Sequence, residues 1–200
     1  TNLDGNREEF EGTASVSLLS AKTTLQAPLG TRGSLSGSIR RTYFDQTVGR
    51  ALKEIPDYWF YDGNAKAFVE LSDRDQLTLS YYGGRDFLDV VFNPDATEQS
   101  GLIIDWGNKT GSLRWTRVVT PRLFGTFWVT GSRFTSDFTL PVADVVERNL
   151  VTDVAFKGHV EHHHADWLVT RFGFEHKRLH VGYTQDFPEG LVDIQHRPRE

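Results

Sequence analysis

The longest alternating stretch of the sequence runs from Trp106 to Phe138 and predicts two long strands joined by a tight turn at 120–122. Successive side chains of a strand point to opposite faces, so alternation marks a strand with two different faces. Each predicted arm exceeds ten residues, whereas a strand of a globular protein has about five or six. On the second arm, one face is apolar or small and the other is more polar: Leu123, Gly125, Phe127, Val129 and Gly131 against Thr126, Trp128, Thr130 and Ser132.

The same period recurs along most of the chain and predicts nine strands with no helix of useful length. A phase switch at about Leu19 to Ala21 indicates two strands joined by a tight bend, or one strand with a bulge. The other predicted strands follow at about 34–43, 65–72, 76–87, 106–119, 123–138, 150–161 and 167–183.

The predicted connections fall into two classes. Short turns at about 29–33, 73–75, 120–122 and 162–166 alternate with long loops at 45–64, 89–101, 139–149 and from 184 onward. A soluble sandwich has no reason to sort its loops in this way, whereas an outer-membrane barrel has short periplasmic turns and long outer loops. The sequence therefore predicts an all-β fold, namely an antiparallel transmembrane β-barrel.

The charges support this interpretation, because most of them occupy the phase opposite the apolar one. That set is Lys22, Arg40, Lys66, Glu70, Arg114, Lys157, Glu161, Arg171 and Glu175. Such a face is too hydrophilic for a dry core and suits a wet lumen or a polar plug. Arg41 and Arg117 occupy the apolar phase, near strand ends, where long side chains reach the lipid headgroups.

Composition excludes several classes of function. No run of apolar residues approaches the length of a transmembrane helix, and a membrane strand need not raise the mean hydropathy of -0.42 because it alternates. The net charge is -5 with both signs interspersed, so there is no basic stripe for nucleic acid. The chain has no cysteine, which excludes disulfides, thiolate catalysis and a cysteine-based zinc site.

Several phrases, in order along the chain, resemble the early barrel strands of TonB-dependent outer-membrane receptors, in the variety found in Bacteroidota-like bacteria. They are GTASVSLLSAKTTLQAPLG, GSIRRTYFDQ, DQLTLSYYGGRDF and NKTGSLRWTRVVTPRLFGTFWVTGSRFTSDF. The resemblance implies a segment of about nine strands from a larger barrel of about 22 strands with a plugged lumen. It further implies that residues 1–9 are a linker from a missing plug domain and that 10–200 are the N-terminal part of the barrel.

The resemblance also implies a function, energy-coupled uptake of a scarce ligand across the bacterial outer membrane. The expected partners are the rest of the barrel and its plug, the TonB complex, outer-membrane lipid and a possible surface lipoprotein. The substrate class stays open among siderophore, glycan, peptide and vitamin. The alternatives are a passive porin-type barrel and a soluble β-rich ligand-binding module.

The candidate ligand-binding residues are Tyr58, Trp59, Tyr61 and Asp62, which we expect in the first long loop at 45–64. Exposed aromatic rings stack on sugars or flat ligands. The alternative is a loop that packs on its own aromatic rings over the barrel mouth. We expect no catalytic residues, metal site or cofactor. His162, His163 and His164 are consecutive, and neighbours on a regular strand point to opposite faces. They fall in the predicted turn at 162–166, where the alternative is a metal site with His176 and His180 of the partner strand.

Overall fold

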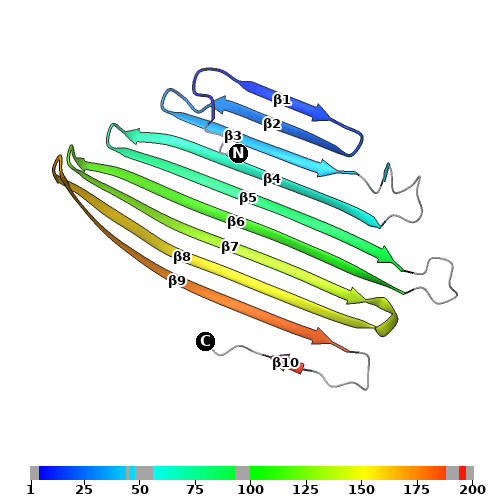
Figure 1. Ribbon diagram of the computed structural model, residues 1–200. Helices are drawn as coiled ribbons and strands as arrows, with labels where there is room; N and C mark the ends of the chain where they lie inside the picture. The colour runs from blue at the N-terminus through cyan, green and yellow to red at the C-terminus, as the bar shows by residue number, and fades with distance from the viewer. Residues whose placement is uncertain (1–4, 44–45, 48–55, 93–99, 188–193, 197–200) are drawn as a thin grey trace.

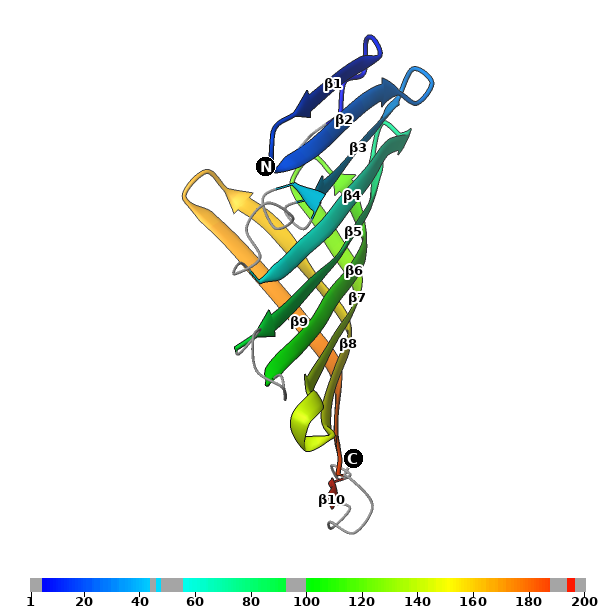
Figure 2. The same ribbon diagram turned by 90° about the vertical axis from the view of Figure 1, so that its right-hand side faces the viewer.

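The computed structural model describes residues 5–43, 46–47, 56–92, 100–187 and 194–196. They form one antiparallel sheet in which each strand pairs with the next along the chain, in the order β1 to β10 (Figures 1 and 2). The strands are β1 Glu11–Val16, β2 Ser20–Pro28, β3 Gly33–Thr42, β4 Asp57–Ser72, β5 Asp75–Val91, β6 Gly101–Thr120, β7 Leu123–Leu140, β8 Val145–Ala165, β9 Leu168–Asp186 and β10 Ile194–His196. A 3-10 turn, η2, covers Pro141–Ala143.

The predicted all-β antiparallel fold is confirmed, and β1 to β9 correspond to the nine predicted strands. The phase switch near Leu19 is a turn between two strands and not a bulge, because β1 and β2 pair as a hairpin. The tail, expected to be a loop, contains the additional short strand β10, which pairs with β9. Within the described ranges β1 and β10 each have one neighbour, so this sheet is open and not closed into a barrel.

The four short turns are confirmed in position and lie together at one end of the sheet, the left end in Figure 1. The last of them is shorter than predicted, because β8 extends to Ala165 and β9 begins at Leu168. His162, His163 and His164 therefore lie on β8 and not in a turn.

The predicted long loops are wrong in extent, because the strands beside them are longer than predicted. The loop expected at 45–64 ends earlier, because β4 already begins at Asp57, while residues 48–55 lie outside the described part. The loop expected at 139–149 is only the η2 turn, closed by Asp144 in the left-handed conformation with φ 50. In the loop expected at 89–101, strand β5 extends to Val91 and residues 93–99 lie outside the described part.

The pairing register gives the sheet two different faces. One row of directly opposed residues across β3 to β8 is entirely apolar: Leu35, Ala67, Leu79, Leu113, Val129 and Phe156. The adjacent row, one residue along each strand, contains Ser36, Lys66, Ser80, Ser112, Thr130 and Ala155. Directly opposed residues share a face, so we call the first the apolar face and the second the polar face. All nine charged residues predicted to oppose the apolar phase lie on the polar face.

The apolar side chains form a band next to the short turns. On β7 the band covers Leu123 to Gly131, and its last row contains Ala65, Tyr81, Gly111, Gly131 and Val154. Nine residues match the length of a tilted strand that crosses a bilayer. Beyond this row the strands continue for a similar length with charged residues on both faces.

This single layer has no packed core among the described residues, where the only buried apolar residue is Ala155. The accessible surface is 14140 Å², whereas a compact protein of this mass exposes about 9,500 Å². Large side chains of the apolar face remain open, including Phe172 at 71 % and Ile39 at 69 % exposure. The apolar face therefore needs a further apolar surface to cover it.

No helix in the described part of the chain has the length and apolar character needed to cross a membrane.

The segment before β1 lies against the polar face. The Arg7 guanidinium lies 4.5 Å from the centroid of the Phe68 ring, and its Nη1 is 2.9 Å from Oε1 of Glu70. Asn6 Oδ1 accepts hydrogen bonds from the backbone N–H groups of Glu8 and Glu9. Residues 5–9, expected to be a linker, are thus fixed to β4 by side-chain contacts.

Candidate functional site

The four predicted ligand-binding residues all lie on β4 and not in a loop, and they do not form one site. Tyr58 and Asp62 are on the polar face, whereas Trp59 and Tyr61 are on the opposite face. This division follows from strand geometry, because successive side chains alternate between faces. Both pairs of residues lie beyond the apolar band, at the side of the band away from the short turns.

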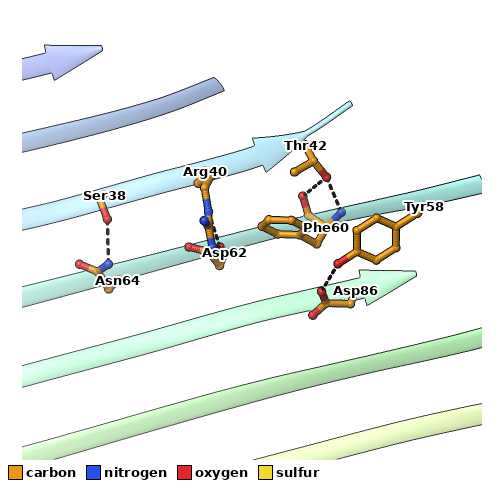
Figure 3. A network of polar contacts seen from close by, with 8 residues as sticks. All are labelled: Ser38, Arg40, Thr42, Tyr58, Phe60, Asp62, Asn64 and Asp86. Atoms are coloured by element: carbon orange, nitrogen blue, oxygen red, sulfur yellow. Dashed lines mark hydrogen bonds and ion pairs between the residues drawn. The ribbon is translucent and has the colours of Figure 1, made fainter. Parts of the chain in front are cut away.

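On the polar face Tyr58 and Asp62 belong to a network of polar contacts that joins β3, β4 and β5 (Figure 3). Arg40 Nε donates to Asp62 Oδ2 at 2.8 Å, and the guanidinium lies 4.7 Å from the Phe60 ring centroid. The Tyr58 hydroxyl donates to Asp86 Oδ1 at 3.3 Å. Cross-strand pairs of this kind fix charged groups in place on the sheet surface.

Two smaller contacts extend this network along the same strands. Asn64 Nδ2 donates to Ser38 Oγ at 2.7 Å, and Thr42 Oγ1 bonds both the N–H and the carbonyl of Phe60. Figure 3 shows these side chains along β3 and β4. The result is a polar surface with a guanidinium, two carboxyls, an amide and a phenol within three strands.

The carboxyl of Asp86 differs from its neighbours in acidity. Burial raises its pKa above the usual range, and the nearby charge of Asp62 acts in the same direction, while the hydrogen bond from Tyr58 opposes both. The pKa of Tyr58 is also raised, chiefly by burial and then by the charge of Asp86. The network therefore offers donors and acceptors for a polar ligand, next to a carboxyl that accepts a proton more readily than an ordinary aspartate.

On the opposite face Tyr61 borders a hollow of about 1030 Å³ that extends over β2 to β7. Three glycines, Gly63, Gly83 and Gly107, are among its lining residues. Trp59 stacks on Tyr61 with ring centroids 6.0 Å apart and on Phe87 at 5.4 Å. Neither Trp59 nor Tyr58 lines the hollow. Tyr61 lines it, and Asp62, the next residue of β4, also borders it although the register places its side chain on the polar face.

Charged residues surround this hollow. Arg85 Nε donates to Asp105 Oδ1 at 2.7 Å, and this hydrogen bond raises the pKa of Arg85. Arg41, Lys109 and Arg133 are exposed and form no ion pair with any described residue. Sequence reasoning identified Arg41 as a charge on the apolar phase but missed Lys109 and Arg133, although both occupy that phase too.

The three histidines of β8 are divided between the faces, as the alternation predicts. The rings of His162 and His164 meet edge to face at 4.1 Å, while His163 Nε2 lies 2.8 Å from Oε1 of Glu161 on the other face. Among the described residues no group of three metal-ligating side chains has the geometry to hold an ion.

No known protein family, curated protein or solved structure matches this chain.

Proposed function

We propose that this chain is part of the wall of an outer-membrane β-barrel, with its apolar face against lipid and its polar face toward the lumen. The observation that carries the proposal is the apolar row from Leu35 to Phe156, adjacent to a row of serine, threonine and lysine. A lipid-facing surface must be apolar over the hydrocarbon depth, and β7 supplies nine such residues from Leu123 to Gly131. A soluble β-rich binding module would leave this face exposed to water.

The position of the band supports an orientation. The apolar band begins at the short turns, such as Pro121–Arg122, which suits turns at the periplasmic surface. The strand ends beyond Gly131 carry charges on both faces and suit an aqueous environment outside the membrane.

We further propose that the whole protein is a TonB-dependent receptor that takes up a scarce ligand, a siderophore, glycan, peptide or vitamin. The support is the resemblance of the strand sequences and the contact of Arg7 with the polar face, where a preceding plug would connect. The proposed partners are the rest of the barrel, the plug, the TonB complex and a surface lipoprotein. In this arrangement the Arg40, Tyr58, Asp62 and Asp86 network faces the outer mouth of the lumen.

The wall proposal is tested with a matched pair of labels. The chain has no cysteine, so Val129→Cys and Thr130→Cys each introduce one attachment point on adjacent positions of β7. Each variant is spin-labelled and placed in lipid vesicles. The relaxation rate of the spin label is then measured in the presence of oxygen, which enters lipid, and separately in the presence of a water-soluble nickel chelate. We expect the label at 129 to respond to oxygen and the label at 130 to nickel. Equal responses at the two positions, or a protein that stays folded and monomeric in plain buffer, would contradict the proposal.

The transport proposal is tested in cells that carry the gene for the whole protein. Labelled siderophores, glycans, peptides and vitamins are offered with and without a functional TonB complex. We expect uptake of one class that requires both the gene and the energy-coupling complex. Uptake that depends on the gene but not on TonB would instead support a passive porin.

A further inference from the structure

The hollow next to Tyr61 contains a pair of like charges that the fold places face to face. Lys109 on β6 and Arg133 on β7 are directly opposite in the register and on the same face of the sheet. Both side chains are exposed, and neither forms an ion pair with a described residue. Like charges directly opposite each other destabilise a sheet, so an anion between them would stabilise it.

The carboxylates that border the hollow do not neutralise this pair. Asp105 already bonds to Arg85. Asp137 lies opposite Asp105 in the register, four residues along the strands from Lys109 and Arg133. Four residues of an extended strand span about 13 Å, beyond the reach of an ion pair. Arg41, which lines the same hollow, adds a further positive charge.

The two residues next to the pair on β5 and β4 are glycines. Gly63 and Gly83 are opposite each other, and Gly83 is opposite Lys109, so the row of the cationic pair continues without side chains of its own over β4 and β5. The Tyr81 side chain lies across Gly83, where a Cβ would be 2.8 Å from the Tyr81 hydroxyl oxygen. A polar group beside Lys109 would therefore meet two cations and the Tyr81 phenol.

The position of the pair relative to the apolar band identifies the class of ligand. Lys109 and Arg133 form the first row beyond the band, whose last row contains Gly111 opposite Gly131. A Cβ added at Gly111 would meet no atom within 4 Å. These two glycines leave a smooth track from the cationic pair toward Leu113 and Val129, with room for an acyl chain below a headgroup.

We propose that this hollow binds the phosphate-bearing headgroup of a membrane lipid. Lys109 and Arg133 bind the phosphate, Arg41 and Tyr61 line the space for the rest of the headgroup, and an acyl chain lies over Gly111 and Gly131. Basic pockets at the membrane surface bind anionic headgroups through the same charge-assisted hydrogen bonds. The inference rests on the proposed function, because it requires the apolar face to meet lipid.

The test measures lipid retention by the whole protein. Protein in detergent is mixed with phosphatidic acid and phosphatidylcholine of matched chains, and the bound lipids are counted by native mass spectrometry. Lys109→Gln with Arg133→Gln is compared with Arg114→Gln with Lys157→Gln, which removes the same charge from the polar face. We expect the wild type and the polar-face variant to prefer phosphatidic acid. The Lys109 and Arg133 variant should bind it at least about tenfold more weakly, because two charge-assisted contacts are lost.

Several outcomes would overturn the proposal. Equal retention of the two lipids by the wild type would do so, as would an unchanged preference in the Lys109 and Arg133 variant. Inorganic phosphate that binds the wild type alone and displaces the lipid completely would indicate a site for free phosphate. If the label at Val129→Cys lies in lipid but the wild type shows no preference for phosphatidic acid, the lipid-headgroup site is wrong and the wall proposal stands. If that label is not in lipid, the wall proposal fails and the lipid site fails with it.

Discussion

Phe127 on β7 lies directly opposite Gly158 on β8, and its ring occupies the space where a side chain at position 158 would be. A Cβ at Gly158 would be 2.5 Å from Phe127 Cδ1 and 3.1 Å from Phe174 Cε1. Phe127 also stacks on Trp115 with centroids 5.6 Å apart, and Phe174 contacts Phe156 at 5.1 Å. The glycine therefore allows four aromatic rings to meet across β6 to β9 within the apolar band.

Gly158→Ala should therefore destabilise the sheet. The neighbours are rings held by other rings, so a new methyl group must displace them at a cost of about 1–3 kcal/mol. The free energy of unfolding is measured by urea titration in micelles, with tryptophan fluorescence as the signal.

Gly111→Ala is the control, because a Cβ there meets no atom within 4 Å. Loss of backbone freedom in the unfolded chain should make this change neutral or stabilising by up to about 1 kcal/mol. Similar losses for both variants would mean that ring displacement is not the cause.

Asp75 holds Trp115 and Arg117 in place through its carboxylate. Ser72 Oγ donates to Asp75 Oδ2 at 2.9 Å, and the Trp115 indole N–H and the Arg117 guanidinium donate to Asp75 Oδ1. A hydrogen bond to a charged acceptor is stronger than one to a neutral acceptor.

Asp75→Asn should therefore shift the indole N–H resonance of Trp115, because a neutral amide replaces the charged acceptor. Trp128, on the polar face, provides an internal control and should not shift. A resonance of Trp115 that stays constant in this variant would refute the assignment.

The sequence predicts a strand correctly where one face of that strand must be apolar. It wrongly predicts a loop where neither face of a strand must be apolar. Residues 57–64 and 145–149 carry aromatic, acidic and aliphatic side chains without a clear period, and the sequence therefore indicated loops. In the structure both stretches are strand segments beyond the apolar band. There pairing with neighbouring strands continues, but no lipid or core imposes an alternation.

The sites differ in how far the sequence could identify them. The separation of His162 and His163 follows from alternation within one strand, although the sequence placed both residues in a turn at 162–166 and not on that strand. The meeting of Lys109 with Arg133 depends on the register between β6 and β7, which the turn at 121–122 sets together with the irregular pairing between Val118 and Thr120. Since one residue of slip would move Arg133 to the other face, no pattern in either strand alone predicts the pair.

The Arg40 and Asp62 pair should be coupled more strongly than an ordinary surface pair. Asp62 is only 16 % exposed, and the guanidinium stacks on Phe60. A double-mutant cycle with Arg40→Ala and Asp62→Ala should give a coupling of roughly 1 kcal/mol, at the upper end for exposed pairs. The matched pair Arg148 and Asp186, about half exposed on both sides, should give less. Equal coupling energies for the two pairs would mean that the stacking on Phe60 and the low exposure of Asp62 do not strengthen the Arg40 and Asp62 pair.

Arg7 should hold the segment before β1 against the polar face. The combined contacts with Glu70 and Phe68 contribute roughly 1–2 kcal/mol at a partly exposed site. Arg7→Ala should therefore speed amide hydrogen exchange in residues 6–9 by about tenfold. Arg7→Lys keeps the charge but loses the planar group over the ring, so it should have an intermediate effect.

Arg32→Ala is the control for this measurement. Arg32 forms an ion pair with Asp73 at a short turn, where the aspartate is 90 % exposed. Its removal should leave exchange in residues 6–9 unchanged. If Arg7→Ala and Arg32→Ala have the same effect, backbone contacts such as that of Gly5 beside Ser34 hold the segment. The Arg7 side chain would then have no part in joining whatever precedes β1 to the wall.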